Sequence, residues 1–365
     1  MPKRINPFQL LVKPAGFQCN LRCGYCFYLK TKELYPEPGP RLMSEDTAER
    51  MIKNYLSLNF PAPVFIWQGG EPSLCGLEFF ERAVELEKKF GGPGQIIGNA
   101  FQSNGVLIDQ DWCEFFARNR FLVGLSMDGP KELHDSYRRD RAGGSSFDQV
   151  WDAGQMLRRQ GVEFNVLCMV TRANAGKARE IARFFRQAGF RYLQFIPAFD
   201  LDPETGRLAG FAPRPEQLAE FLVELFQWWW PEREAISIRD FDWLAAPGLQ
   251  GRLCVFSESC APYLAVEHNG DVYPCDFYVR AREKLGNIGE ARAGFAELFR
   301  RRERAFSPRK KWLSRACRAC PWLRFCFGGC LREREAKDNP DPKKSIYCPA
   351  YSALFETAFN KIRAG

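Results

Sequence analysis

Histidine is scarce in this chain of 365 residues, which contains only His134 and His268. So low a count nearly excludes zinc sites of the Cys2His2 kind. Long apolar runs are also missing, since no stretch reaches the roughly 20 apolar residues that a membrane helix needs. The segment after the basic N-terminal residues is too short and too strand-like for a signal peptide. We therefore expect a cytoplasmic protein without membrane contact.

A dense block of one charge sign is missing as well. The formal net charge is +8 at pH 7, but the cations are scattered along the chain. The densest run, residues 300–304, contains Glu303, and we interpret it as the solvated face of a helix. Without a basic stripe interleaved with aromatic residues we expect no nucleic-acid binding, although a basic surface favours an acidic partner.

Cysteine, in contrast, is abundant, with fourteen residues, more than a cytosolic chain of this length usually carries. Three cysteines lie within residues 19–26 and eight within residues 254–348. The other three, Cys75, Cys113 and Cys168, stand alone among apolar neighbours. Isolated free cysteines are often buried, so we interpret these three as core residues.

Predicted strands and helices alternate over the first 200 residues. The strands are expected over residues 8–12, 64–67, 96–102, 121–126, 164–170 and 192–196. The helices are expected over residues 44–58, 77–90, 109–119, 147–160 and 175–188. Several strands are continuously apolar, as in a parallel sheet that is buried on both faces. The alternation predicts right-handed βαβ units in a barrel or an open α/β sheet.

Four groups of polar or small residues follow the predicted strands. They are the first cysteine group, Gly69-Gly70, Asn104-Gly105 and Asp128-Gly129. Ligands of α/β folds bind at the carboxyl ends of the strands, so these groups should converge on one rim. Turn formation is the alternative role for Asn104 and Asp128, because Asx–Gly pairs make turns well.

The character of the chain changes after about residue 236. A helix is expected over residues 211–230, closed by Pro231, and a hairpin over residues 265–273 with its turn at Asn269-Gly270. The cysteine-rich stretch that follows has too little apolar periodicity to fold around its own core. Bound metal or clusters would supply the missing stability. A final helix is expected over residues 351–362.

Cys19, Cys23 and Cys26 lie in one tight loop. Three thiolates there suit a four-iron cluster, because iron–sulfur clusters are held by cysteine thiolates. Three ligands leave one iron open to an exchangeable molecule, as in open zinc sites. On spacing alone, a structural zinc site that borrows a distant fourth cysteine is the alternative.

This C-x3-C-x2-C loop, with Tyr25 before the last cysteine, resembles the signature of the radical S-adenosylmethionine (SAM) superfamily. The Gly69-Gly70-Glu71-Pro72 segment is similar to the glycine-rich motif of that superfamily. The resemblance implies an α/β fold, a partial (β/α)6 radical SAM barrel over residues 1–235. It also implies that the open iron binds SAM, whose one-electron cleavage gives a 5′-deoxyadenosyl radical.

The same resemblance implies a set of SAM contacts at the strand ends. They are Tyr28, Gln68, Gly69, Gly70, Glu71, Ser103, Asn104, Ser126, Asp128, Asn165 and Leu167. Simple packing is the alternative role for Tyr28.

The eight C-terminal cysteines form two sets of four, and by proximity residues 317–330 would supply one complete set. Their pattern resembles the cysteine-rich SPASM domain of peptide-modifying radical SAM enzymes, here over residues 236–350 and followed by a C-terminal helix over residues 351–365. Structural zinc ribbons are the alternative. The resemblance implies two auxiliary 4Fe–4S clusters with crossed ligands. The first takes Cys254, Cys260, Cys275 and Cys330, and the second takes Cys317, Cys320, Cys326 and Cys348.

Asp276 directly follows a predicted cluster ligand, Cys275. A carboxylate at this place is suited to take a proton from a substrate beside an electron acceptor. Its alternative roles are capping a turn and pairing with a nearby arginine.

A closer resemblance extends over nearly the whole chain. Residues 11–15, 27–28, 68–72, 124–130, 237–239 and 273–278 resemble the anaerobic sulfatase-maturating enzymes. This implies radical SAM oxidation of a Cys or Ser in a sulfatase Cys/Ser-x-Pro-x-Arg motif to Cα-formylglycine, without oxygen. The general base would be Asp276, and a flavodoxin- or ferredoxin-like protein would donate electrons to an enzyme with three 4Fe–4S clusters.

Two other functions stay open. Residues 197–214 do not align with the family and would border the substrate channel. If the substrate site has diverged, a radical SAM/SPASM maturase that forms thioether or carbon–carbon crosslinks in a ribosomal peptide is the alternative. A non-catalytic zinc- or cluster-binding adaptor is the third possibility.

Overall fold

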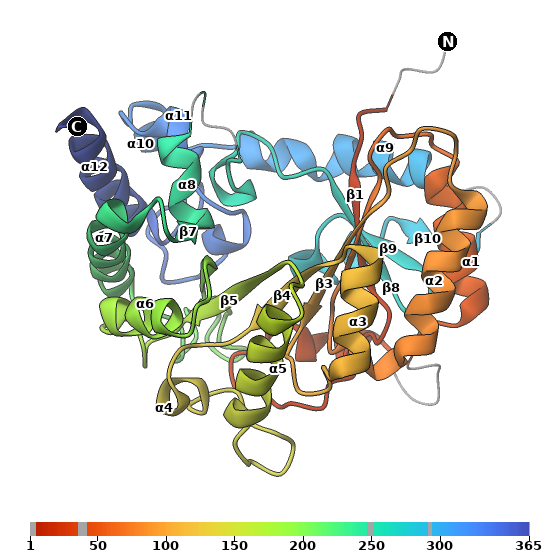
Figure 1. Cartoon of the computed structure of the whole chain (residues 1–365). Coiled ribbons are helices and arrows are strands. Elements are labelled where there is room, and N and C mark those ends of the chain that lie inside the picture. Colours follow the sequence, from red (N-terminus) through yellow and green to blue (C-terminus); the bar gives the residue numbers. More distant parts are fainter. Residues whose placement is uncertain (1–4, 36–41, 247, 249–250, 291–293, 365) are drawn as a thin grey trace.

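The computed structural model describes residues 5–35, 42–246, 248, 251–290 and 294–364. Its centre is a ten-stranded sheet in the order β10-β9-β8-β1-β2-β3-β4-β5-β6-β7 (Figure 1). The strands are β1 Gln9–Lys13, β2 Val64–Trp67, β3 Gly98–Ser103, β4 Leu122–Ser126, β5 Phe164–Val170, β6 Tyr192–Pro197, β7 Ser237–Ile238, β8 Tyr263–Glu267, β9 Asp271–Tyr273 and β10 Gly286–Asn287. The six strands predicted in the first 200 residues are confirmed, each to within two residues.

Parallel pairing runs through the larger part of the sheet. Strands β1 to β7 pair in parallel in chain order, and β8 joins the other side of β1, also in parallel. The β8–β9 and β9–β10 pairs are antiparallel. The predicted hairpin is β8–β9, and Gly270 in its turn has a φ of +85° that favours glycine.

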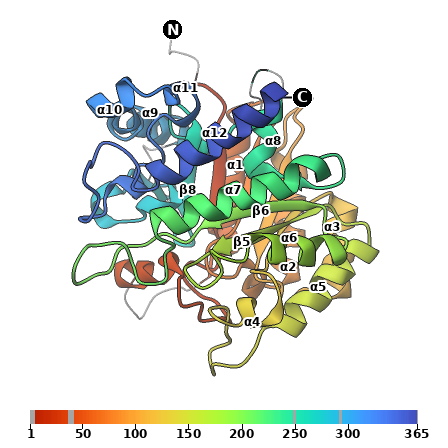
Figure 2. The same cartoon turned by 90° about the vertical axis from the view of Figure 1, so that its left-hand side faces the viewer.

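Helices cover the outer face of the curved sheet (Figures 1 and 2). The helices of the described ranges are α1 Glu45–Leu56, α2 Leu77–Phe90, α3 Gln110–Asn119, α4 Lys131–His134, α5 Phe147–Arg159, α6 Ala178–Gln187, α7 Pro215–Glu232, α8 Arg239–Ala245, α9 Phe295–Ala305, α10 Arg315–Arg318, α11 Leu323–Cys326 and α12 Cys348–Ala364. Local sequence sets several starts, since Ser44 caps α1 through Thr47 N–H at 3.2 Å and Asp109 caps α3 through Trp112 N–H at 3.1 Å.

The expectation that Pro231 closes a helix over residues 211–230 is wrong at both ends. The helix α7 starts at Pro215 and continues through Pro231 to Glu232. Proline is tolerated at the first helical position, where no N–H donor is needed. Pro231 leaves the Gln227 carbonyl without an intrahelical partner, but Gln227 is exposed and water can satisfy it.

The core divides between the two faces of the sheet by simple alternation. Leu10 and Val12 of β1 pack in the cluster beneath the helices, whereas Leu11 packs with Tyr28 and Tyr273 on the inner face. Period-two alternation places Lys13 on the same inner face as Leu11. The predicted core cysteines Cys113 and Cys168 are buried, and Cys75 is half-buried.

The sheet continues past residue 235, where the sequence predicts a domain boundary. Strand β7 extends the barrel sheet beside β6, and β8 returns to pair with β1. The terminal helix α12 packs against α7 (Figure 2). The division into residues 1–235, 236–350 and 351–365 stays a prediction.

No helix of the described ranges is long and apolar enough to cross a membrane.

A pH-dependent stability is expected from Glu87, a buried carboxyl in α2. Its Oε2 accepts from Asn99 Nδ2 at 2.8 Å, and burial raises its pKa from 4.5 to about 8. The folded chain therefore binds the proton more tightly, so stability falls as pH rises from about 4.5 to about 8. We expect Glu87→Gln to raise the unfolding temperature more at about pH 8.5 than at about pH 6. The control is exposed Glu85→Gln, and equal shifts at both pH values contradict the argument.

Candidate active site

The loop that carries Cys19, Cys23 and Cys26 leaves the carboxyl end of β1 and is fixed by backbone hydrogen bonds. Gly70 N–H donates to the Gly16 carbonyl at 2.8 Å, and Glu71 N–H donates to the Gln18 carbonyl at 2.7 Å. These bonds hold the start of the cysteine loop against the segment that follows β2.

Glycine is required where these two segments touch. A Cβ on Gly70 would lie 1.9 Å from the Gln18 carbonyl oxygen, far inside contact distance. Gly69 has a φ of +123°, a conformation that L side chains rarely adopt. The Gly69-Gly70 pair is therefore explained first by the close approach of two backbones.

The Glu71 side chain is fully buried and joins two strand ends. Its Oε1 accepts from Ser73 N–H at 3.1 Å, Ser73 Oγ at 2.7 Å and Ser103 Oγ at 2.9 Å. Its Oε2 accepts from Asn104 N–H at 2.7 Å. Burial raises the pKa of Glu71, while the Asn104 and Ser73 donors oppose that rise. The carboxylate therefore clamps the end of β3 to the loop after β2.

Asn104 carries this connection on to the cysteine loop. Its Nδ2 lies 3.5 Å from Cys19 Sγ and 2.7 Å from Asn20 Oδ1. The predicted convergence of the cysteine loop with Gly69-Gly70 and Asn104 on one rim is confirmed.

Asp128, after β4, completes the rim. Its Oδ2 accepts from the Tyr25 hydroxyl at 2.5 Å and lies 3.0 Å from Arg138 Nε, while its Oδ1 accepts from Met169 N–H at 2.9 Å. The aromatic residue before Cys26 is therefore anchored by a buried ion pair. Gly129 follows with a φ of +113°, so Asp128 also begins a turn.

The three thiols of the loop suit a cluster bound by thiolates. None of them is in a disulfide. Burial raises the pKa of Cys19 to about 11 and of Cys23 to about 12, and it also raises the pKa of Cys26. Backbone N–H groups oppose this: Leu21 N–H lies 3.3 Å from Cys19 Sγ. Such N–H donors stabilise thiolates, which iron would need and whose formation releases protons.

The eight C-terminal cysteines fall into two groups by their surroundings. Burial raises the pKa of the Cys275 thiol, and nearby Asp276, Cys330 and Cys254 raise it further. Cys254 likewise adds to the raised pKa of Cys260. The other four, Cys317, Cys320, Cys326 and Cys348, line one cavity of about 70 Å³. This is the crossed grouping, in which Cys330 joins the earlier cysteines and Cys348 the later ones. Within the described ranges, no three His, Cys, Asp or Glu side chains form a site for a single metal ion.

Buried cations tie the loops of the first group together. Lys310 Nζ donates to the Val255 carbonyl at 2.9 Å and the Gly329 carbonyl at 2.5 Å. Arg334 Nε donates to the Gly328 carbonyl at 3.1 Å. Both cations lower the pKa of Cys260 against the larger effect of burial. Positive charge in this place balances the negative charge that four thiolates would bring.

Asp276 lies where the cysteine loop meets the C-terminal cysteine groups. It begins a short 3-10 helix, Asp276–Tyr278, and its Oδ1 accepts from Cys275 Sγ at 3.3 Å. Its Oδ2 is 4.0 Å from Lys13 Nζ, so its charged partner is a lysine rather than the arginine considered from sequence. The Asp276 carboxylate is 18 % exposed and lines a cavity of about 280 Å³.

The two halves of the site meet through aromatic rings. Phe27 follows Cys26 and Phe277 follows Asp276, and their ring centres are 4.8 Å apart. Arg332 stacks on both rings, at 4.6 Å from the Phe27 centre and 4.5 Å from the Phe277 centre. The segment after the first cysteine group is thus in direct contact with the segment of Asp276.

Several predicted SAM contacts have their polar atoms bound to other protein groups. Glu71, Ser103 and Asp128 are buried and hydrogen bonded as described above, and the Tyr28 hydroxyl donates to Glu267 Oε1 at 2.5 Å. Ser126 Oγ accepts from Gln102 Nε2 at 2.8 Å. Direct SAM contact stays a prediction for these residues, as it does for Gln68, Gly69, Gly70, Asn104, Asn165 and Leu167.

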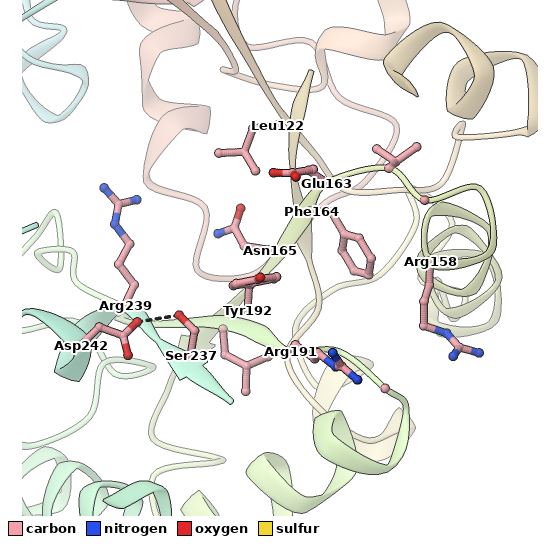
Figure 3. Close-up of a pocket in the computed structure, with 14 residues that line it drawn as sticks. Leu122, Arg158, Glu163, Phe164, Asn165, Arg191, Tyr192, Ser237, Arg239 and Asp242 are labelled. Carbon is pink, nitrogen blue, oxygen red and sulfur yellow. Dashed lines mark hydrogen bonds between the residues drawn. The ribbon is translucent and has the colours of Figure 1, made fainter. Parts of the chain in front are cut away.

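A larger cavity, of about 790 Å³, lies at the opposite ends of the strands (Figure 3). Its lining includes Leu122, Phe164, Tyr192 and Ser237, the first residues of β4 to β7. Asn165 also lines it. This cavity is therefore at the amino ends of the strands, away from the cysteine loop.

Sequence reasoning missed three charged residues of the site. Lys13 lies beside Asp276, Arg138 binds Asp128, and Glu267 accepts the Tyr28 hydroxyl. A signal existed for Lys13 and Glu267, because each is the charged last residue of a strand whose three preceding residues are apolar. Arg138 lies in an irregular segment, where the sequence gives no such contrast.

Two family models match different parts of the chain. A family model described as the radical SAM superfamily matches residues 14–185. A second model, described as the SPASM iron–sulfur cluster-binding domain, matches residues 256–321.

Named relatives match nearly the whole chain. A "cysteine-type anaerobic sulfatase-maturating enzyme" of Clostridium perfringens is 39% identical over 98% of this chain and 97% of that relative. A "serine-type anaerobic sulfatase-maturating enzyme" of Bacteroides thetaiotaomicron is 34% identical over 96% of this chain and 89% of that relative. The solved structure described as "native anSMEcpe with bound AdoMet and Cp18Cys peptide" has a TM-score of 0.89 at 38% identity, covering 98% of both chains.

The contact between Gly70 and Gln18 predicts the effect of a single methyl group. Gly70→Ala must push the cysteine loop away from the strand end, since its neighbour is backbone and cannot yield. We expect the purified variant to hold less iron than the wild type and to lose SAM cleavage. The control is Gly176→Ala, where an added Cβ has no atom within 4 Å. Wild-type iron content and SAM cleavage in Gly70→Ala would show that the close approach is not needed.

Proposed function

This chain belongs to the anaerobic sulfatase-maturating enzymes of the radical SAM superfamily, and we propose that it oxidises a Cys or Ser of a sulfatase polypeptide to Cα-formylglycine without oxygen. The family, the partial-barrel fold and the SPASM domain expected from the sequence are confirmed. The observation that carries the proposal is the contact between Phe27 and Phe277, which brings the three-cysteine loop and Asp276 to one site.

The arrangement of the cysteine thiols suggests which cofactors the chain binds. We propose that Cys19, Cys23 and Cys26 hold a 4Fe–4S cluster with one iron open to SAM. The two C-terminal sets would hold one fully ligated auxiliary cluster each, three clusters in all. When bound, the SAM-binding cluster and SAM supply the radical that removes a hydrogen atom from Cβ of the target residue. The backbone N–H donors and buried cations around the thiols support this ligand set.

Asp276 supplies the proton acceptor. Its carboxylate is partly exposed to a cavity and adjoins Cys275, so it can reach the target from the side of the first auxiliary set. We propose that it takes the proton of the target thiol or hydroxyl. Loss of the Cβ hydrogen atom to the radical, of this proton to Asp276 and of one further electron, which an auxiliary cluster would accept, gives a thioaldehyde from Cys; water hydrolyses it with release of hydrogen sulfide. The same losses give the aldehyde directly from Ser.

An acidic electron-carrier protein of the flavodoxin or ferredoxin kind is the proposed redox partner. Residues 304–332, which surround three cysteines of the second set, contain eight Lys or Arg and no Asp or Glu between Arg304 and Arg332. Arg315, Arg318 and Arg324 are exposed. Such a surface favours an acidic partner.

A cytoplasmic location is proposed as well, because all fourteen cysteines are free thiols and the clusters need them reduced.

The direct test offers two peptides, Cys-x-Pro-x-Arg and Ser-x-Pro-x-Arg, to the anaerobic wild-type enzyme with SAM and reductant. Mass spectrometry should find formylglycine in at least one of them. A thioether or carbon–carbon crosslink in place of formylglycine supports the ribosomal-peptide alternative, and SAM cleavage with both peptides intact contradicts sulfatase maturation.

Asp276→Asn tests the proposed base. We expect the variant to keep its iron and SAM cleavage, because Asp276 is not a proposed ligand, and to lose product by about 100-fold, typical for removal of a general base. The matched control is Asp148→Asn, a change at a side chain that is 78 % exposed on α5. Product at the wild-type rate in Asp276→Asn excludes its role as base.

Iron counting tests the crossed ligand sets. Cys317→Ala and Cys348→Ala should remove the same auxiliary cluster, so the double variant should lose about four irons, no more than either single variant. Cys317→Ala combined with Cys330→Ala should lose about eight. The opposite pattern would show that neighbours in sequence share a cluster. Circular dichroism of each variant checks that the fold survives.

A further inference from the structure

Lys13 is a charged side chain buried at the carboxyl end of β1. It is 1 % exposed and lies on the inner face of the sheet, where Tyr28 of the N-terminal part packs near Tyr273 of the C-terminal part. Two groups confine its aliphatic stem and ammonium. A Cβ on Gly69 would lie 3.1 Å from Lys13 Cδ, and the Tyr28 ring centre is 4.8 Å from Lys13 Nζ.

The ammonium of Lys13 has fewer partners than its chemistry demands. A lysine ammonium carries three donors. Within the described ranges, Lys13 Nζ makes no hydrogen bond, and its one ion-pair partner is Asp276 Oδ2 at 4.0 Å. Burial of an incompletely paired charge is costly, so such a residue is weak support for the fold. Lys13 Nζ is therefore placed beside the carboxylate that lines the cavity, 4.0 Å from Asp276 Oδ2.

Lys13 is the ion-pair partner that the described residues give Asp276, while Lys30, Arg280 and Arg332 line the cavity into which Asp276 opens. Glu267, its register partner on β8, accepts the Tyr28 hydroxyl through Oε1. On its other side the Asp276 carboxylate adjoins Cys275, whose Sγ is 3.3 Å from Oδ1. Phe27, Tyr28 and Phe277 supply apolar walls, so charge that arises here is poorly solvated by protein dipoles.

We propose that Lys13 is a positioning residue that aims Asp276 Oδ2 at the target residue and balances the negative charge throughout the proton transfer. The inference rests on the proposed function and adds a residue to it. When the proton moves from the target sulfur or oxygen to Asp276, the carboxylate becomes neutral and the negative charge passes to the substrate atom. Lys13 transfers no proton in this step, forms no covalent bond, and lies next to the charge before and after it.

The test uses the holoenzyme and three variants. Lys13→Met keeps the length of the side chain without its charge, and Lys13→Arg keeps the charge. The control, Lys53→Met, removes an exposed lysine that also lies over an aromatic ring, with Nζ 5.7 Å from the Phe90 centre. For each protein we measure iron content, unfolding temperature, peptide KM, and product formed per 5′-deoxyadenosine.

The expected result separates positioning from a role in the fold. Lys13→Met should keep its iron and its unfolding temperature, because an apolar residue of similar volume replaces a poorly paired charge. Its kcat and its product per 5′-deoxyadenosine should fall by at least about tenfold with KM unchanged, a modest case of lost electrostatic preorganisation. Lys13→Arg should have a kcat and a product per 5′-deoxyadenosine at least about threefold above those of Lys13→Met, and Lys53→Met should match the wild type.

Each other outcome has a definite meaning. Loss of iron or a lower unfolding temperature in Lys13→Met assigns Lys13 to the fold and overturns the proposal. If Lys13→Met forms product per 5′-deoxyadenosine within about twofold of the wild type, the proposal is overturned as well. If the wild-type enzyme forms formylglycine on neither peptide, the proposed function fails, and the role of Lys13 fails with it.

Discussion

The buried Glu71 carboxylate is the interaction on which the arrangement of the site depends. It accepts four hydrogen bonds from Ser73, Ser103 and Asn104, and so it joins the ends of β2 and β3. Asn104 extends the connection to Cys19 Sγ. A buried carboxylate is stable only with such a set of donors, so the strand ends and the cysteine loop are held in one relative position. The three thiols are thereby presented together on the rim.

A second constraint comes from strand pairing. Strand β8 pairs in parallel with β1, in the register that places Glu267 beside Lys13. This pairing places the turn of the β8–β9 hairpin at the carboxyl end of the barrel strands; β9 then runs back along β8 to Cys275 and Asp276, and Asp276 Oδ2 lies 4.0 Å from Lys13 Nζ. The segment of Asp276 therefore contacts the segment that follows the three-cysteine loop, through the Phe27 and Phe277 rings. The proposed chemistry needs this juxtaposition, because proton and electron must leave the same substrate residue.

Local sequence predicts much of this molecule, for physical reasons that differ between its parts. The strands of the first 200 residues are short apolar runs between caps and glycines, and the rim residues follow them directly, so both could be located. The contact of β8 with β1 could not, because it joins residues about 250 positions apart and leaves no local periodicity. The start of α7 at Pro215 was also missed, since a proline at a helix start resembles a proline in a loop.

The cysteines show the same limit. Spacing identifies the three-thiol loop, but proximity in sequence would group Cys330 with Cys317, Cys320 and Cys326, whereas in the fold Cys330 lies near Cys254 and Cys275. In the fold Cys348, at the start of α12, lines one cavity with Cys317, and only the tertiary structure reveals it. Lys13 is a related case: a lysine at the end of a buried strand is conspicuous, but the carboxylate beside it lies 263 residues further along the chain.

The central claim is that the Cys19, Cys23 and Cys26 loop holds a cluster with an iron that SAM can bind. Electron–nuclear double resonance on the reduced enzyme with SAM labelled with ¹⁵N at its amino group tests it most directly. The account predicts a ¹⁵N coupling to the cluster in the wild type and in a variant without the second auxiliary set, and none in Cys23→Ala. A wild-type enzyme whose N-terminal cluster gives no ¹⁵N coupling, with spectra unchanged by SAM, would contradict the account.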